Sequence, residues 1–389
     1  VLAVALAFLA LGSAALGANG SFAAALIWLT NIGIIEKGRL IEIEALYASL
    51  TGLALICWLS WWQQRRSAWL TSTVPWLFLG LGMLAKGPLH LVFFYAVVVA
   101  VLFRNRELRI LLHPAHFIGV IVMLGIFAAW AIPSLQLMRQ NDVAHTWSRQ
   151  FSGRLSGEDF HLSGWLMNIP RSVGYFLPWT FLLLFLPRAV FADDRAAKMA
   201  SGLAWGTALS FIGVSLLPGA LARYTMPLLG AASWLAAMLL TAERFDLPRW
   251  LRPRRPSGVL PALRLPVIVA AIAAVAIALY AVAAIPYLKK REKVRNLAQQ
   301  INAAVSANEP LYAVDPDYQP FLFYVRDPII YVPRVADLPT TAREVLVQAR
   351  DESEALQSVK WQPLTPRAVL RLKDYRGKSV TLLHVGADS

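Results

Sequence analysis

The sequence predicts a mainly α-helical, polytopic membrane protein with about ten transmembrane helices and a small C-terminal α/β domain outside the membrane. Three observations predict this fold class. Hydrophobic residues make up 57% of the 389 residues, charged residues make up 15%, and the mean hydropathy is +0.53, which is too apolar for a soluble chain of this length. Long apolar runs recur up to residue 287, and residues 288–389 differ in composition.

The apolar runs are long enough to cross a hydrocarbon core of about 30 Å. We expect spans near residues 1–17, 20–36, 40–62, 70–86, 88–103, 115–138, 167–187, 200–217, 222–241 and 264–287. Together they form one transmembrane domain over residues 1–287. The chain opens at Val1 inside an apolar run without flanking charges, and counting the loops backward predicts at least one further span and an outer loop upstream.

The basic residues predict the orientation of the spans. The formal net charge is +14, but Arg and Lys are spread over short loops and form no contiguous stripe, so we expect no nucleic-acid partner. They gather in four alternate loops, around residues 65–66, 104–109, 188–198 and 244–264, which the positive-inside rule places in the cytoplasm. The single cysteine, Cys57, excludes an intramolecular disulfide.

Residues 288–389 are predicted to form a separate domain on the outer side. Helix-like stretches alternate there with short apolar runs, namely LYAV, PIIYV, EVLVQA and SVTLLHV, a pattern typical of a small α/β domain. The segment contains no glycine-rich phosphate loop, no His/Cys metal spacing and no serine-nucleophile elbow. We therefore expect a partner or lid domain.

The first outward turn, EKGRLIEIE, places charged side chains beside two spans. Glu36, Lys37 and Glu42 fit an ordinary charged turn with internal ion pairs. Arg39 and Glu44 point instead to a function, because Glu44 begins an apolar run and a carboxylate there is costly unless it meets a cation or a polar cavity.

Two further outward turns contain cations at the ends of spans. Lys86 lies in MLAKGPLH between two apolar runs, and Arg223 and Tyr224 lie in ARYTMPLL immediately before another run. Arg offers a fixed fork of donors that suits phosphate, and Tyr adds a hydroxyl donor. With Arg39, these residues predict a cationic outer pocket for an anionic lipid headgroup or a lipid-linked phosphate. The alternative is that each cation only snorkels to the membrane surface.

A long outward loop over residues 139–166 is rich in His, Arg and Trp. It is longer than a simple connection requires, and loops of this length are often functional. We therefore expect this loop to have a function. The alternative for its Trp residues is a role as interfacial anchors.

The order and spacing of four motifs resemble a known family. These motifs are EKGRLIEIEALYASL, LGMLAKGPLHLV, HTWSRQFSG followed by HLSGWLMNIPRSVGYFLPW, and ARYTMPLL. They resemble the membrane glycosyltransferases with the GT-C fold, in the group (glycosyltransferase family 39-like) that includes the lipid A aminoarabinose transferase and the protein O-mannosyltransferases. Residues 288–389 resemble, more weakly, the small outer domain of the aminoarabinose-transferase branch.

This resemblance implies a bacterial inner-membrane enzyme with its active site and C-terminal domain in the periplasm. It would transfer a sugar from a polyprenyl-phosphate donor to a lipid, glycan or protein acceptor by direct displacement, with inversion. Lys86, Arg223 and Tyr224 would hold the donor phosphate, and Glu44 would be the catalytic carboxylate in a place where the family usually has Asp. The resemblance also implies that His145, Arg149 and His161 belong to a loop that covers the site and contacts the donor or the acceptor. The principal acidic residue of the family lies in a first outer loop that this sequence lacks, which predicts N-terminal truncation.

Two other classes remain open from the sequence. A transporter or flippase for lipid-linked sugars could use the same pocket, but it needs polar groups along a path through the membrane midplane. A non-catalytic assembly subunit of an envelope complex is the other alternative. We predict no cofactor besides the lipid-linked donor and no metal site, although carboxylates and His on the outer face would permit a divalent metal.

Overall fold

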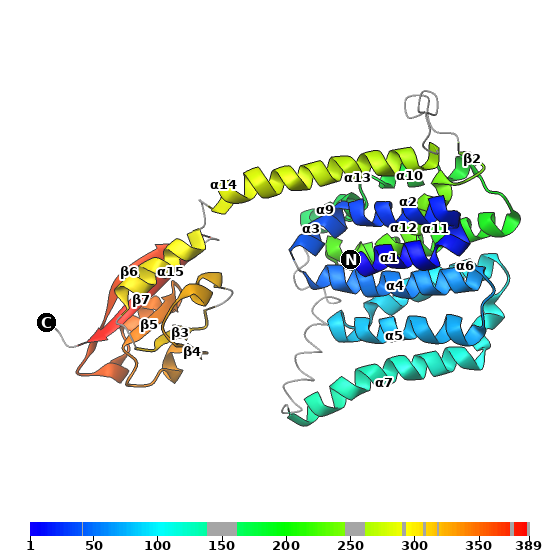
Figure 1. Cartoon of the computed structure of the whole chain (residues 1–389). Helices are drawn as coiled ribbons and strands as arrows, with labels where there is room; N and C mark the ends of the chain where they lie inside the picture. Colours follow the sequence, from blue (N-terminus) through cyan, green and yellow to red (C-terminus); the bar gives the residue numbers. More distant parts are fainter. Residues whose placement is uncertain are drawn as a thin grey trace. The chain divides into compact units, whose positions relative to one another are not determined.

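The structure, a computed structural model, describes two compact units of the chain, Val1–Val275 and Ala276–Ser389 (Figure 1). The described residues are 1–40, 42–137, 162–245, 261–289, 293–305, 309–316, 319–373 and 377–386. His145, Arg149 and His161 lie outside these ranges. The domain boundary at 287/288 stays a prediction.

The first unit is built from helices. They are α1 (Leu2–Leu11), α2 (Ser13–Thr30), α3 (Ile32–Arg39), α4 (Ile43–Gln63), α5 (Ala68–Lys86), α6 (Leu89–Arg104), α7 (Pro114–Leu137), α9 (Leu162–Tyr175), α10 (Thr180–Leu183), α11 (Asp194–Ser215), α12 (Leu229–Leu240) and α13 (Pro261–Leu279). Short 3₁₀-helices cover η1 (Leu108–Leu112), η2 (Leu186–Arg188) and η3 (Ala222–Leu228), and β1 (Ala189–Val190) pairs with β2 (Arg244–Phe245).

Several of these helices can cross a membrane by length and composition. In the described part of the chain, α2, α4, α5, α7 and the stretch Leu263–Tyr287 meet that criterion, and α1 and α6 are shorter apolar helices. Helix α5 lies between α4 and α7 (Figure 1). Buried Trp28, Trp58, Trp76 and Trp234 belong to the core, whereas α7 exposes large apolar side chains that suit lipid. The chain is thus a polytopic membrane protein.

Some helix boundaries differ from the expected spans because the backbone leaves the α-helical conformation inside the apolar runs. The expected spans 1–17 and 20–36 correspond to three helices, and α2 contains a kink at Gly17. The expected span 222–241 begins as the 3₁₀-helix η3, which contains Pro227. Proline lacks a backbone N–H, so it disrupts the α-helical hydrogen-bond pattern. Hydropathy alone does not register these interruptions.

A glycine pair brings α11 against α6. A Cβ atom added to Gly202 would lie 2.6 Å from the Cα of Val101, and one added to Gly206 would lie 2.5 Å from the Cα of Val97. Spaced four residues apart, the two glycines share one face of α11, and small residues at this spacing allow helix backbones to approach closely in membranes. The contact fixes α11 on α6.

Replacing Gly206 with alanine is therefore expected to lower the free energy of unfolding by about 1–3 kcal/mol, because the added methyl group would overlap the α6 backbone. Gly213→Ala is the matched control on the same helix, since a Cβ atom there meets nothing within 4 Å. Thermal unfolding of both variants in detergent measures the difference. Equal unfolding temperatures would contradict the close approach of α11 and α6.

The second unit combines helices with a five-stranded mixed sheet. Its strands follow the order β4 (Ile329–Val332), β3 (Leu311–Val314), β5 (Glu344–Gln348), β7 (Ser379–Gly386) and β6 (Thr365–Lys373). Strand β3 pairs in parallel with β4 and β5, and β7 pairs antiparallel with β5 and β6. The α-helices of this unit are α14 (Ile285–Lys289), α15 (Lys293–Ala304) and α16 (Glu352–Leu356). Apolar side chains of α15, including Ile301, share a buried cluster with Leu311 and Leu382 of the sheet.

Candidate functional site

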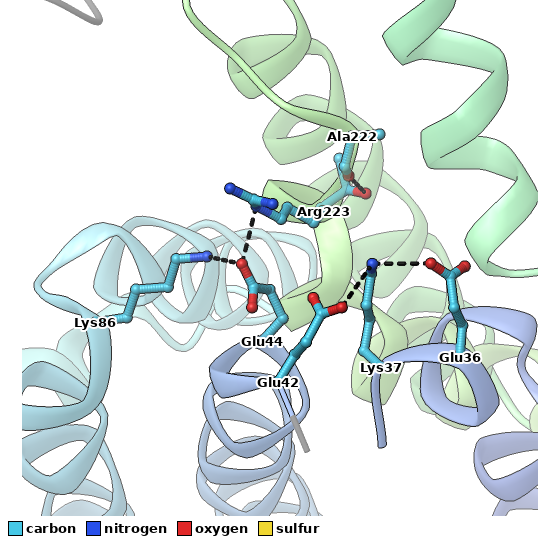
Figure 2. Close-up of polar contacts among 8 residues, drawn as sticks. Glu36, Lys37, Glu42, Glu44, Lys86, Ala222 and Arg223 are labelled. Atoms are coloured by element: carbon cyan, nitrogen blue, oxygen red, sulfur yellow. Dashed lines mark hydrogen bonds and ion pairs between the residues drawn. The ribbon is translucent and has the colours of Figure 1, made fainter. Parts of the chain in front are cut away.

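The candidate site is centred on Glu44 in the first turn of α4 (Figure 2). Its carboxylate Oε1 lies 2.9 Å from Nζ of Lys86 and 2.9 Å from Nε of Arg223. Lys86 is the last residue of α5, and Arg223 lies in the first turn of η3. Three elements that are distant in the sequence therefore converge on one carboxylate oxygen.

The burial of these three side chains is uneven. The Glu44 side chain is 8% exposed, the Lys86 side chain 21% and the Arg223 side chain 43%. A buried carboxylate is stable only when it is paired, and here two cations face one anion. The three residues together have a net positive charge, and the arginine remains accessible, which suits an incoming anion.

Two aromatic rings border the ammonium group of Lys86. Its Nζ lies 5.0 Å from the centroid of the Tyr224 ring and 5.9 Å from that of the Tyr47 ring. Both distances are within the range of cation–π attraction. Tyr224 itself is buried in a cluster with Phe93 and Leu228, so η3 is anchored while Arg223 beside it reaches the carboxylate.

The turn that carries Lys86 depends on Gly87. Helix α5 ends at Gly87, which has φ +99° and ψ −172°. Residues with a Cβ atom rarely adopt this backbone conformation. Glycine therefore allows the chain to leave α5 immediately after Lys86. Pro88 follows and precedes the first residue of α6. The short motif Lys-Gly-Pro thus positions the lysine at a helix end.

A second set of charges lies beside this site. Nζ of Lys37 is 2.8 Å from Oε1 of Glu36 and 3.2 Å from Oε1 of Glu42, which confirms the internal ion pairs expected for this turn (Figure 2). Burial acts to lower the pKa of Lys37, but hydrogen bonds to the two carboxylates outweigh it and raise that pKa above its ordinary value. The pairs balance the turn without involving Glu44.

The structure brings together four of the residues that the sequence analysis singled out: Glu44, Lys86, Arg223 and Tyr224. Arg39 is exposed on the last turn of α3. Tyr47, whose hydroxyl holds the turn after Lys86, was not among the residues predicted from the sequence. Its position three residues after Glu44 could have identified it from the sequence, because this spacing places both side chains on one face of α4.

A second carboxylate with two cations lies beyond the other end of α4. Glu107 Oε1 is 3.0 Å from Nη2 of Arg65 and 3.5 Å from Nη1 of Arg195, and Glu107 Oε2 accepts a hydrogen bond of 2.8 Å from Nε1 of Trp62. The 21 residues of α4 separate the two clusters by about 30 Å at 1.5 Å per residue. The Glu107 cluster is therefore a matched comparison for the Glu44 cluster.

Within the described residues, no group of three or more His, Cys, Asp or Glu side chains is placed to hold a metal ion.

Comparisons with solved structures identify the fold. The chain superposes on ArnT from Cupriavidus metallidurans bound to undecaprenyl phosphate with a TM-score of 0.63 and 18% identity, covering 98% of this chain and 82% of that one. The apo state of ArnT from the same organism gives a TM-score of 0.59 and 19% identity, covering 98% and 83% of the two chains. No protein-family model and no curated protein sequence matches the chain. The chain therefore has the GT-C fold of a lipid A aminoarabinose transferase, as the resemblance of its motifs predicted.

Proposed function

We propose that this protein is an integral-membrane glycosyltransferase that moves a sugar from a polyprenyl-phosphate donor to a lipid, glycan or protein acceptor on the periplasmic face. The observation that carries the proposal is the convergence of Lys86 and Arg223 on Glu44 at the end of a span. The GT-C fold supports it, and so does the undecaprenyl phosphate bound to ArnT, the structural neighbour.

Lys86 and Arg223 would bind the donor phosphate. Lys86 donates a hydrogen bond to Oε1 of Glu44 and Arg223 forms an ion pair with the same oxygen, so an entering phosphate would offer both cations a second anion with more acceptor oxygens. The ring of Tyr224 would border the ammonium group of Lys86. Arg39, which is exposed at the end of α3, would add a further cation. In this proposal the phosphate draws the two cations away from the carboxylate.

The same exchange would prepare Glu44 for catalysis. A carboxylate released from its two cations is a better proton acceptor. The acceptor hydroxyl oxygen attacks the anomeric carbon, the bond from that carbon to the phosphate oxygen breaks, and the hydroxyl proton passes to Glu44. Negative charge develops on the departing polyprenyl phosphate, where Lys86 and Arg223 stabilise it. Attack opposite the leaving group inverts the anomeric centre.

The rest of the topology is part of the proposal. About ten spans would lie in a bacterial inner membrane, with residues 288–389 as an α/β domain in the periplasm. The loop that contains His145, Arg149 and His161 would cover the site and contact the donor or the acceptor. In this proposal the reaction requires the donor and the acceptor, and no further small molecule.

The distribution of charge favours an enzyme over a transporter. Among the described residues up to Val275, Glu44 is the only Asp, Glu, Lys or Arg that is buried. It lies at a helix end, whereas a transport path needs polar groups at the membrane midplane.

The orientation is tested by cysteine labelling in intact cells. Arg65→Cys is expected to react only with a reagent that reaches the cytoplasm, whereas Glu36→Cys should react with an impermeant reagent from outside, because α4 separates the two positions. Native Cys57 is buried and serves as the unreactive background. Labelling of Arg65→Cys from outside would overturn the topology.

The reaction is tested in proteoliposomes with a polyprenyl-phosphate donor labelled in its sugar. We expect transfer of the label to an added acceptor by the protein, and loss of that transfer when Lys86 and Arg223 are both alanine. Bound donor with no sugar transfer under any acceptor would contradict the enzyme assignment and favour the transporter or the assembly subunit.

A further inference from the structure

Tyr47 and His90 are hydrogen-bonded to each other and to the turn that joins α5 to α6, directly after Lys86. Oη of Tyr47 donates a hydrogen bond of 2.9 Å to the carbonyl of Gly87, the residue that ends α5. The same oxygen accepts a hydrogen bond of 2.7 Å from the backbone N–H of His90, in the first turn of α6. One hydroxyl of α4 therefore contacts both sides of the turn.

These contacts satisfy backbone groups that would otherwise lack partners. The first N–H groups of a helix need an acceptor from outside it, and the residue before α6 is Pro88, which provides no side-chain cap. Tyr47 supplies that acceptor from a neighbouring helix. Its ring is buried, with 3% of its surface exposed, so no solvent replaces the hydroxyl at this position.

The His90 ring holds the same turn from the other side. It is fully buried, and its Nε2 lies 2.9 Å from the carbonyl oxygen of Leu79. Its Nδ1 lies 3.0 Å from both the Tyr47 hydroxyl and the Gly87 carbonyl. Gly82 leaves room for the ring, since a Cβ atom there would be 2.7 Å from Nε2.

Tyr47 and Glu44 lie on one face of α4 and contact consecutive residues of the turn. Glu44 pairs with the side chain of Lys86, and Tyr47 holds the backbone carbonyl of Gly87. The long lysine side chain is flexible, so fixing its backbone limits where its ammonium group can lie. Two attachments, one to the side chain and one to the backbone, define the position of the cation.

We infer that Tyr47 and His90 are positioning residues that set Lys86 for the donor phosphate. This inference rests on the proposed function. Neither residue touches the donor in this account; they act through the Lys86–Gly87–Pro88 turn.

The test is a double-mutant cycle with undecaprenyl phosphate as the probe and the whole protein in nanodiscs. Tyr47→Phe keeps the ring and removes the hydroxyl, and it is expected to raise the Kd for the probe about tenfold. In a Lys86→Ala background the same change should leave the Kd unaltered, because Tyr47 acts through Lys86. Gly82→Ala, which crowds His90 from the other side, should raise the Kd only when Lys86 is present.

Tyr95→Phe is the matched control. Tyr95 on α6 also faces a histidine ring, with its hydroxyl 3.3 Å from Nε2 of His116, but it has no contact with the Lys86 turn among the interactions described. It should leave the Kd unaltered. In turnover assays Tyr47→Phe should raise the donor KM more than it lowers kcat, whereas a general loss of structure would lower the fraction of active protein and leave KM unchanged.

Failure of the inference and failure of the proposed function give different results. If Lys86→Ala weakens binding but Tyr47→Phe does not, or if Tyr47→Phe has the same effect with and without Lys86, the positioning role is wrong and the phosphate site stands. If Lys86→Ala leaves binding unchanged, the phosphate site itself is wrong and the inference falls with it.

Discussion

Replacing Lys86 with alanine is expected to weaken binding of undecaprenyl phosphate about tenfold, and replacing Lys86 and Arg223 together about a hundredfold, since each removes a charge-assisted hydrogen bond worth about 1.5–3 kcal/mol. Both side chains lie 2.9 Å from the same oxygen of Glu44, so both can reach an anion at that position. Titration of the lipid into the purified protein in nanodiscs measures the Kd.

The controls separate a phosphate site from general attraction of anions. Lys86→Arg keeps the charge and should retain most of the affinity. Arg195→Ala removes a cation from the Glu107 cluster at the other end of α4, and it should not change the Kd. Unchanged binding in both Lys86→Ala and Arg223→Ala would refute the phosphate site. An equal loss of affinity in Arg195→Ala would show that the effect comes from net charge alone.

Replacing Glu44 with glutamine is expected to lower kcat by about 10²–10⁴-fold, because the amide cannot take a proton from the acceptor. The amide nearly preserves the shape of the side chain, so the folding yield should fall far less than turnover. Binding of undecaprenyl phosphate should be equal or tighter, since the variant removes the carboxylate that competes for Lys86 and Arg223. Initial rates, the yield of folded protein and lipid titration measure the three quantities.

Glu44→Asp is the conservative comparison, because it keeps the carboxylate and shortens the side chain by one methylene. It should retain more turnover than Glu44→Gln. Equal losses of turnover and folding yield in Glu44→Gln would return Glu44 to a structural role, as the counter-ion that allows two cations to lie beside a span.

The sequence predicts the class of this fold better than its boundaries. Composition and apolar runs are sufficient for a polytopic membrane protein, because the bilayer imposes long apolar segments. The division of residues 1–36 into three helices, with a kink at Gly17, depends on local backbone geometry that hydropathy does not measure. The close approach at Gly206 likewise depends on which helix lies opposite.

The site is predictable to a similar extent. Glu44, Lys86 and Arg223 stand out because a charge beside an apolar run is costly without a partner. Their meeting at a single oxygen is a property of the helix packing and could not be inferred from the separate motifs. Tyr47 and His90 are harder to predict, because aromatic and imidazole rings in an apolar run resemble ordinary core residues.

We propose that Lys86 and Arg223 exchange the Glu44 carboxylate for the phosphate of a polyprenyl lipid. An experimental structure of this protein with undecaprenyl phosphate tests it most directly. We expect phosphate oxygens within about 4 Å of Nζ of Lys86 and of the Arg223 guanidinium, the usual ion-pair limit, with at least one of the two cations no longer on Glu44. A lipid phosphate bound elsewhere, with both ion pairs of Glu44 intact, would contradict it.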